Sequence, residues 1–465
     1  MRPLELALLA VELAGLLGLL LGPRLGGRMA RIVGYAALLP IPVALAQLWL
    51  EGWRWQLAGL TVLALLLPLG WLVRARRRRI PGIVAGVGIA ALVLAAVPPV
   101  AVPMFALPAP TGPYGIGTAT YAWLDESRPE IFTDDPADRR ELIGQLWYPT
   151  APGAAGTRVR YLDEAAAVRP LAGLLRLPPF VFDHLAQIGT PAVAGAPVAA
   201  APARWPVLIY LHGRGGYRQA NSRQVIQLAS QGYVVLTLDQ PYAASGVRLP
   251  DGRLARLDPR MTDRDFVDAA IPSLAADVSF ALDRLAELDR ADPSGRFTGR
   301  LALDRVGLFG LSLGGAVTAE ACRTEPRIKA CLPIDNFMPD PVVAEGLRQP
   351  TLWLTRDAAT MRREGWSEEA IEDTLGSIRA TFDDHGPGGW LVQLPGLYHL
   401  DFSDAPLITP LARTAGLSGP IDPDRGRLII DAVTEAFFDH HLRGRSAEPL
   451  RTLPDRYPEL IMDAT

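Results

Sequence analysis

Apolar residues crowd into the first hundred positions of this 465-residue chain, and that crowding constrains the fold more than any other feature. Four apolar stretches each approach the ~20 residues that a helix needs to cross the hydrocarbon core of a bilayer. They cover residues 4–21, 32–50, 57–73 and 83–102. A cleaved signal peptide would be one short apolar run, whereas three more runs follow the first here. We therefore predict four transmembrane helices in residues 1–105, followed by a separate domain.

Arginines in the short loops between these stretches predict the orientation of the membrane region, because Arg-rich loops stay on the cytoplasmic side during insertion. The loops after the first and third stretches are rich in arginine: Arg24, Arg28 and Arg31 in one, Arg74 and residues 76–79 in the other. The loop after the second stretch has only Arg54 beside Glu51. We therefore expect the large C-terminal region to lie outside the cytoplasm, attached to the lipid bilayer of the cell membrane.

Glu12 is an ionisable residue inside the first apolar stretch, a position that is a functional hint in a membrane protein. No partner acid, base or histidine is evident in the other stretches. We therefore interpret Glu12 as a protonated or bundle-facing residue and disfavour a transporter.

Charge and cysteine content exclude several other classes of protein. The formal net charge is -3, so no overall basic field favours nucleic acid. Cys322 and Cys331 are too few for a disulfide framework and lack the spacing of a zinc site. Whether these two cysteines form one disulfide with each other is left open. We predict no metal and no organic cofactor, and make no prediction of oligomeric state.

After residue 105 the sequence predicts an α/β fold, because short apolar runs alternate with longer helical patterns. The expected strands cover residues 142–147, 207–211, 234–238, 306–309, 330–334, 351–354 and 390–394, and the expected helices cover residues 222–231, 271–287, 315–323 and 428–442. A mostly parallel sheet with helices on both faces follows. We place this domain at residues 106–443. The Ala- and Pro-rich segment 151–206 is either a lid or a surface insertion, and residues 444–465 form a polar tail.

The segment Gly310-Leu311-Ser312-Leu313-Gly314 matches G-x-S-x-G, in which small residues let a strand turn sharply into a helix and expose the serine hydroxyl. A buried strand is expected before it and a helix with small residues after it. An ordinary Gly-rich turn is the competing interpretation, and this context argues against it. Ser312 is therefore the candidate nucleophile.

A serine nucleophile needs an imidazole base, which follows the serine in sequence in this kind of fold. His184 and His212 precede Ser312 and so do not fit that order. His385 lies in a polar turn that we expect to be solvated. His440 and His441 end the last helix, where a histidine interacts favourably with the helix dipole. His399 follows the strand at 390–394 and precedes the terminal helix. We therefore predict His399 as the base.

The acid of a triad is left open between two aspartates at the ends of neighbouring strands. Asp335 ends one strand and Asp357 follows the next, and strand order alone favours Asp357. The oxyanion hole needs two backbone N–H groups. Leu313, which follows the nucleophile, and Arg214, in the glycine-rich loop after the strand at 207–211, are the predicted donors.

Several segments together resemble the platelet-activating factor acetylhydrolase family of the plasma and intracellular type II kind, a branch of the α/β-hydrolases. They are PTGPY at 110–114, QLWYP at 145–149, IDNFMP at 334–339 and HLDF at 399–402. The resemblance spans roughly residues 108–443 and implies Asp335 as the acid. It also implies calcium-independent hydrolysis of short or oxidised acyl chains from phospholipids, and bacterial relatives resemble general carboxylester hydrolases.

The sequence thus predicts a membrane-anchored serine hydrolase that cleaves carboxylic esters through Ser312, His399 and Asp335. A dienelactone-hydrolase-like or polyester-cleaving esterase is the alternative within enzymes. A catalytically inactive membrane receptor or scaffold is the alternative from another class, and the complete set of catalytic residues argues against it.

Overall fold

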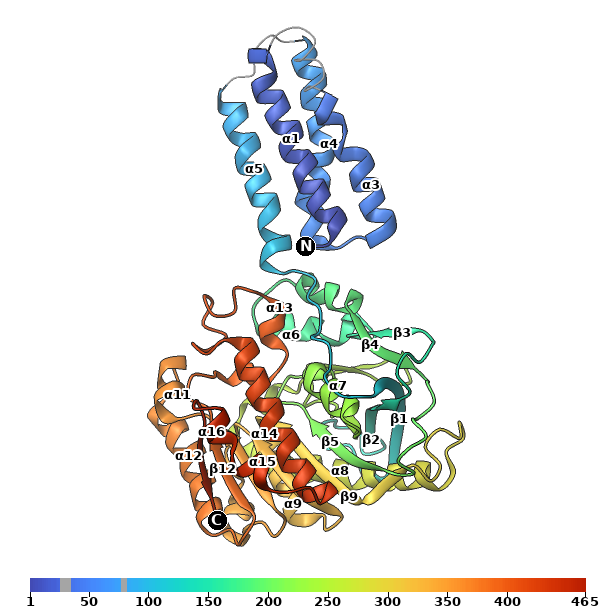
Figure 1. Ribbon diagram of the computed structural model, residues 1–465, viewed down its shortest axis with the longest axis vertical. Helices are drawn as coiled ribbons and strands as arrows, with labels where there is room; N and C mark the ends of the chain where they lie inside the picture. The colour runs from blue at the N-terminus through green and yellow to red at the C-terminus, as the bar shows by residue number, and fades with distance from the viewer. Residues whose placement is uncertain (26–34, 77–81) are drawn as a thin grey trace. The chain divides into compact units, whose positions relative to one another are not determined.

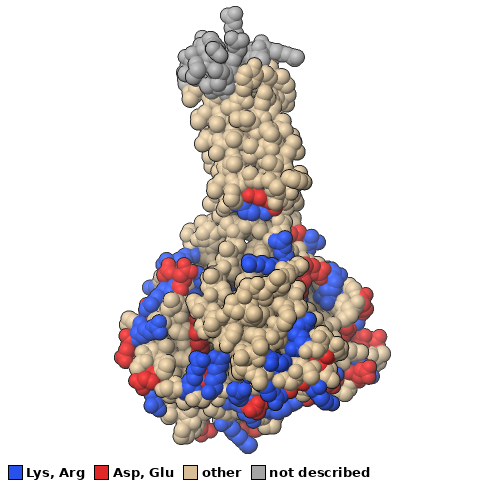
Figure 2. Space-filling view, turned by 45° about the vertical axis from the view of Figure 1, so that its right-hand side comes forward, with Lys and Arg blue, Asp and Glu red and all other residues tan. Residues whose placement is uncertain are grey.

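A computed structural model describes residues 1–25, 35–76 and 82–465 of the chain (Figure 1). Within these residues the chain divides into two compact units. The first is Met1–Phe105 with Asp183–Leu185 and Leu407–Leu411, and the second holds the rest. On the face that Figure 2 shows, the N-terminal unit is almost free of charged side chains, whereas both signs of charge are scattered over the second unit.

The N-terminal unit is a bundle of apolar helices. They are α1 (Pro3–Leu25), η1 (Ala36–Leu38), α3 (Pro40–Glu51), η2 (Trp55–Leu57), α4 (Ala58–Arg76) and α5 (Gly82–Ala101). Among the described residues, two helical segments are long and apolar enough to cross a membrane, Pro3–Leu21 and Trp55–Leu72. They coincide with the first and third predicted spans.

The other two apolar helices are shorter within the described residues, Ala36–Glu51 and Gly86–Ala101. A helix of 12 residues such as α3 is only ~18 Å long, less than the ~30 Å of hydrocarbon. The described helices therefore do not support four spans. Parts of the prediction, including residues 32–34 and the arginines at 28, 31 and 77–79, lie outside the described residues.

Polar groups inside the N-terminal unit are more numerous than the sequence analysis recognised. The carboxylate of Glu5 forms a fully buried ion pair with Arg54, whose Nη2 lies 2.8 Å from Oε2. Arg54 lies in the loop between α3 and η2, as the sequence predicts, but its guanidinium is buried in this pair. Glu12 is fully buried and therefore faces the bundle, and neither of its carboxylate oxygens has a hydrogen-bond partner among the described residues.

The second unit is built on one mixed sheet of 11 strands in the order β13-β12-β11-β10-β9-β5-β6-β2-β1-β4-β3. The strands are β1 (Gly115–Pro129), β2 (Arg139–Thr150), β3 (Arg158–Arg160), β4 (Gly189–Ala194), β5 (Trp205–Leu211), β6 (Val234–Asp239), β9 (Leu301–Leu311), β10 (Ile328–Ile334), β11 (Thr351–Thr355), β12 (Gly389–Gln393) and β13 (Ile461–Ala464). The run from β6 to β12 is parallel throughout. A separate ribbon pairs β7 (Gly246–Arg248) with β8 (Leu254–Arg256).

Helices cover both faces of the sheet because the parallel strands are apolar on both sides. One face packs against α8 (Arg264–Ala291), α9 (Leu313–Thr324), α10 (Asp340–Glu345) and α12 (Glu368–Asp383). The other packs against α7 (Ser222–Ser230) and α14 (Pro423–Arg443). The predicted α/β fold is confirmed: all seven expected strands and all four expected helices are present. The sequence pattern does not predict α10 or α12, nor α11 (Ala358–Glu364), which follows β11.

Two segments that the sequence left without a definite structure are ordered elements. Residues 151–206 contain β3, η3 (Ala165–Ala167), α6 (Arg169–Leu174), η4 (Pro179–Gln187) and β4, and β4 pairs with β1. Residues 444–465, expected as a polar tail, contain α15 (Glu448–Arg451), α16 (Leu453–Arg456) and β13. Strand β13 pairs antiparallel with β12 and so belongs to the sheet.

Candidate active site

Ser312 lies on a sharp bend between β9 and α9. Its φ of 58° is unusual for a residue with a side chain, and such strain concentrates at functional sites. The flanking glycines are required by space: a Cβ on Gly310 would lie 2.3 Å from the carbonyl oxygen of Gly314, and a Cβ on Gly314 would lie 2.3 Å from that of Leu211. The strand, bend and helix that the sequence predicted are therefore present.

Asp335 and His399 come from two other segments at the same edge of the sheet and meet there. Asp335 follows the last residue of β10, and His399 begins the short helix η6 (His399–Phe402) after β12. The imidazole donates from Nδ1 to Oδ2 of Asp335 over 2.6 Å. This bond fixes the tautomer, because a carboxylate can only accept, and leaves Nε2 of a neutral ring able to take a proton.

Asp335 is held as a carboxylate by its surroundings. Burial raises the pKa of this group, but the positive charge of Arg356 and the hydrogen bonds from His399 and Arg356 outweigh burial and lower the pKa to about 2. The hydroxyl of Thr355 donates a further hydrogen bond of 3.0 Å to Oδ1. Asp335 is therefore ionised at neutral pH.

Ser312, Asp335 and His399 line one pocket of about 270 Å³ together with Leu313 and Arg214. Leu313 is the first residue of α9, so its N–H has no intrahelical acceptor and is available to an anionic oxygen. The loop that carries Arg214 approaches the nucleophile closely, since a Cβ on Gly213 would lie 3.2 Å from Cβ of Ser312. The side chain of Arg214 is engaged elsewhere and donates to the carbonyl of Met261 over 2.8 Å.

Asp357, the alternative acid, has a structural contact instead. It is the N-cap of α11, where its Oδ1 accepts from the backbone N–H of Thr360 over 3.3 Å and from the Thr360 hydroxyl. The carboxylate bonded to the His399 ring is that of Asp335. Strand order alone was therefore a poor guide to the partner of His399.

The remaining histidines have their own environments. His385 is 7% exposed and its two ring nitrogens lie 2.7 Å and 3.0 Å from the carbonyls of Gly386 and Gln349, so the expectation of a solvated turn is wrong. His212 is buried, which lowers its pKa, and its Nδ1 lies 2.8 Å from the carbonyl of Gly213. Burial and the nearby His440 lower the pKa of His441 to about 4. The His441 ring is therefore neutral at pH 7 and carries no charge to interact with the helix dipole.

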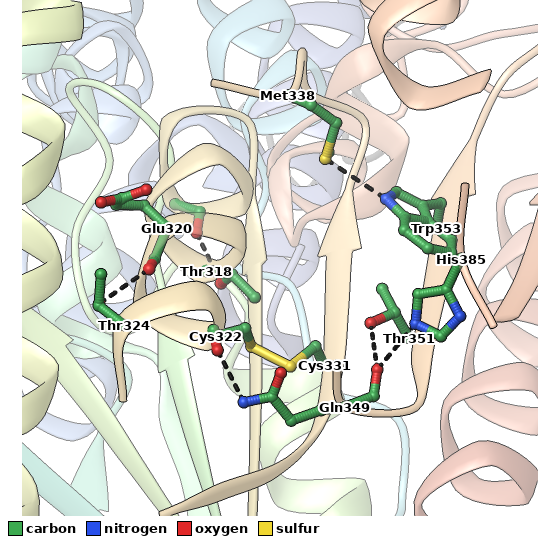
Figure 3. Close-up of a disulfide and its surroundings, with 11 residues drawn as sticks. Thr318, Glu320, Cys322, Thr324, Cys331, Met338, Gln349, Thr351, Trp353 and His385 are labelled. Carbon is green, nitrogen blue, oxygen red and sulfur yellow. Dashed lines mark hydrogen bonds between the residues drawn. A yellow bond between two sulfur atoms is a disulfide. The ribbon is translucent and has the colours of Figure 1, made fainter. Parts of the chain in front are cut away.

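A disulfide joins two elements that carry site residues. Cys322 near the end of α9 is bonded to Cys331 in β10, which answers the question that the sequence left open. Figure 3 shows the bridge beside Gln349, whose amide donates to the carbonyl of Cys322 over 2.7 Å. Ser312 precedes α9 and Asp335 follows β10, so the disulfide covalently links the two elements that carry these residues.

Three residues that the sequence analysis did not single out surround the Asp335–His399 pair: Arg356, Glu364 and Trp366. The available signal was the position of Arg356, directly after a parallel strand at the edge where the site residues gather. Arginine is too common in this chain for that position to stand out.

Comparison with known proteins agrees with the resemblance found in the sequence. Residues 106–244 match the family model described as platelet-activating factor acetylhydrolase, isoform II. Among solved structures, a ferulic acid esterase from Streptomyces cinnamoneus is similar, with a TM-score of 0.62 and 28% sequence identity over 77% of this chain and 99% of that chain. Residues 106–244 are therefore similar to the platelet-activating factor acetylhydrolase, isoform II, family, and the second unit has the α/β-hydrolase fold.

Proposed function

We propose that this protein is a membrane-anchored serine carboxylester hydrolase in which Ser312 is the nucleophile, His399 the general base and Asp335 the acid that orients the base. One observation carries the proposal: the 2.6 Å bond between His399 and Asp335 lies in the pocket that also contains the strained Ser312. The match of residues 106–244 to the family model and the similarity to an esterase support an ester-hydrolysing enzyme.

In each half of the reaction His399 accepts one proton and then donates it to the leaving group. Nε2 of His399 takes the proton of the Ser312 hydroxyl while Oγ attacks the ester carbonyl, and the N–H groups of Leu313 and Arg214 stabilise the resulting oxyanion. The imidazolium then protonates the departing alcohol, which leaves an acyl-enzyme. Water attacks this ester with His399 again as base, and the acid is released with Ser312 restored. Asp335 stabilises the imidazolium in both halves and keeps its own charge.

The pocket favours a short acyl group. Its volume is about 270 Å³, and its apolar walls include Val267, Phe337 and Trp366. A long unbranched chain would not fit within that volume. We therefore propose short or oxidised acyl esters, including those of phospholipids, as the substrate class.

Two alternatives are retained because each has a direct assay. A dienelactone-hydrolase-like or polyester-cleaving enzyme would hydrolyse lactones or polyester films, and the similar solved structure is named as an esterase of ferulic acid. The full-length enzyme should be compared on nitrophenyl acetate, a short-chain phosphatidylcholine, a feruloyl ester and a lactone. Preference for the phospholipid supports the proposal. Preference for the feruloyl ester or the lactone contradicts the proposed substrate class.

We further propose that the catalytic unit lies outside the cytoplasm, attached through the apolar N-terminal helices. The disulfide between Cys322 and Cys331 supports this location, because such bonds persist in oxidising compartments and are rare in the cytosol. Protease added to intact cells should cut the catalytic unit. Protection of that unit until the membrane is permeabilised would place it inside.

Reaction with a fluorophosphonate probe tests the catalytic proposal directly. The full-length protein should become labelled on Ser312, and Ser312→Ala should lose both labelling and all but a residual ester hydrolysis. Ser446→Ala removes an exposed hydroxyl from the same chain and should behave as the unsubstituted protein. A folded protein that is not labelled would instead support an inactive receptor or scaffold.

A further inference from the structure

We infer that Arg356, Glu364 and Trp366 form a positioning set that holds the Asp335–His399 pair in its working geometry and balances its charge. None of the three is assigned a chemical step. The inference deepens the proposed function and depends on it, because it concerns how the proposed base and acid are held.

Arg356 links the acid of the pair to a second carboxylate. It directly follows β11 and is fully buried, and its Nε lies 3.0 Å from Oδ1 and 2.9 Å from Oδ2 of Asp335. Its Nη1 donates to Oε2 of Glu364. A buried guanidinium requires such compensation, since an unpaired charge in this position would be strongly destabilising.

Glu364 returns the contact to His399. It is the last residue of α11, and its Oε1 accepts from the backbone N–H of His399 over 3.1 Å. The contacts therefore form a closed ring of four residues: His399 to Asp335 through the imidazole, Asp335 to Arg356, Arg356 to Glu364, and Glu364 back to the His399 backbone. His399 is thus fixed at two points, its ring and its main chain.

Trp366 covers this ring of contacts. Helix α11 ends at Gly365, whose φ of 100° allows the N–H of Trp366 to bond back to the carbonyl of Met361 over 3.1 Å. The indole consequently lies 4.6 Å from Cζ of Arg356 and 5.7 Å, between ring centroids, from His399. An aromatic face beside a guanidinium attracts it and shields the ion pairs from water.

The charges in the ring act on His399 in opposite directions. The positive charge of Arg356 partly cancels the field of Asp335 and so disfavours the imidazolium, while the negative charge of Glu364 partly cancels that of Arg356. The other charged residues that line the same pocket are Arg214, Asp263, Arg264 and Asp373. Arg264 is paired with Asp373 over 2.8 Å, and substitutions in the ring leave this pair in place.

Opposite shifts in the pH profile distinguish this role from a merely structural one. The full-length enzyme in detergent is assayed for kcat/KM on uncharged nitrophenyl acetate, where the acidic limb reports the His399 pKa in the free enzyme. Arg356→Gln removes the positive charge, so the limb should move to higher pH. Glu364→Gln keeps an acceptor but removes the negative charge, so the limb should move to lower pH. We expect each shift to be about 0.5 to 1.5 pH units.

Further variants control for folding and for general loss of activity. Arg362→Gln removes an arginine of α11, the helix that also carries Glu364. The ion pair of Arg362 with Glu368 is exposed, so this variant should leave the acidic limb of the pH profile in place. Arg356→Lys restores the charge without the planar guanidinium, so the limb should return toward its original pH while kcat stays reduced. Neither Arg356 nor Glu364 is among the residues that line the pocket, so kcat should fall more than KM rises.

The outcome separates the two proposals. Unshifted limbs in folded Glu364→Gln and Arg356→Gln proteins, or shifts of the same sign in the two, would overturn the positioning role while Ser312 still reacts with a fluorophosphonate. If Ser312 does not react in the unsubstituted enzyme, the proposed function itself fails. Arg356→Gln can fold poorly, and Glu364→Gln, whose side chain is 14% exposed, then carries the test alone.

Discussion

Cys322 and Cys331 are joined across the end of α9 and the middle of β10, and both sulfur-bearing side chains are fully buried. The two elements present Ser312 and Asp335 to the pocket from neighbouring positions in the sheet. The cysteines are only nine positions apart along the chain, so the closed loop is short.

Replacing both cysteines by alanine should lower the free energy of unfolding by about 2 to 3 kcal/mol, because a loop of this size loses closure entropy on that order. In a domain this large, we expect the thermal midpoint to fall by only roughly 3 to 4 °C. Differential scanning fluorimetry of the full-length protein measures this. A reductant should lower the midpoint of the unsubstituted protein and leave the double variant unchanged. Equal midpoints for the two proteins would show that the bond does not stabilise the fold.

Asparagine at position 335 and asparagine at position 357 should have very different effects on activity. Asp335→Asn removes the acceptor that selects the tautomer of His399, and loss of the corresponding charge lowers kcat by roughly 10⁴-fold in other triads. Asp357→Asn keeps a good N-cap residue on α11, so activity should stay within about twofold. Steady-state kinetics of both variants decide between the two aspartates. The reverse order of losses would make Asp357 the acid.

The part of the site that the sequence predicted is the part with a local signature. Ser312 lies in a five-residue motif, and His399 follows a recognisable strand and turn. Arg356 and Glu364 have no such signature, because their importance comes from contacts with residues far away in the chain. Asp335 required the family resemblance, since its neighbourhood alone did not separate it from Asp357.

The same distinction holds for the fold. The seven predicted strands are short apolar runs, whereas β1 alternates half-buried and exposed residues over its middle part and β13 has four residues that are mostly exposed. Neither has the hydrophobic run of a buried parallel strand. Hydropathy likewise does not reveal that Arg54 is buried, because its ion-pair partner, Glu5, lies 49 positions earlier in the chain.

Alanine at Gly314 should reduce activity by distorting the oxyanion hole. The added Cβ would lie 2.3 Å from the carbonyl oxygen of Leu211 and 2.7 Å from that of His212, both in the backbone that leads to Arg214. That backbone must shift, and loss of one oxyanion donor costs about 10²- to 10³-fold in kcat. Gly376→Ala is the matched control, because it lies within helix α12 and its Cβ would meet nothing within 4 Å. Full activity in Gly314→Ala would show that this close approach does not position the hole.

Asparagine at Asp404 should stabilise the protein in neutral and alkaline solution. Asp404 is buried, and its Oδ2 accepts long hydrogen bonds from the backbone N–H of Arg223, at 3.2 Å, and from the hydroxyl of Tyr161, at 3.3 Å. Burial is the main cause that raises its pKa from 3.8 to about 7. A raised pKa in the folded state means that the stability contribution is complete below the unfolded pKa and is lost as pH rises through about 7.

Above pH 7 the folded protein must therefore hold a poorly compensated carboxylate, which an amide of the same shape avoids. We expect Asp404→Asn to raise the free energy of unfolding at pH 8 by roughly 2 to 4 kcal/mol, with the gain shrinking steadily toward pH 4. Thermal midpoints of both proteins at pH 4.5, 6 and 8 measure the trend. Asp304→Asn, which changes an exposed aspartate in β9, should show no such trend. A gain that is equal at all three pH values would mean that packing, and not the ionisation of Asp404, separates the two proteins.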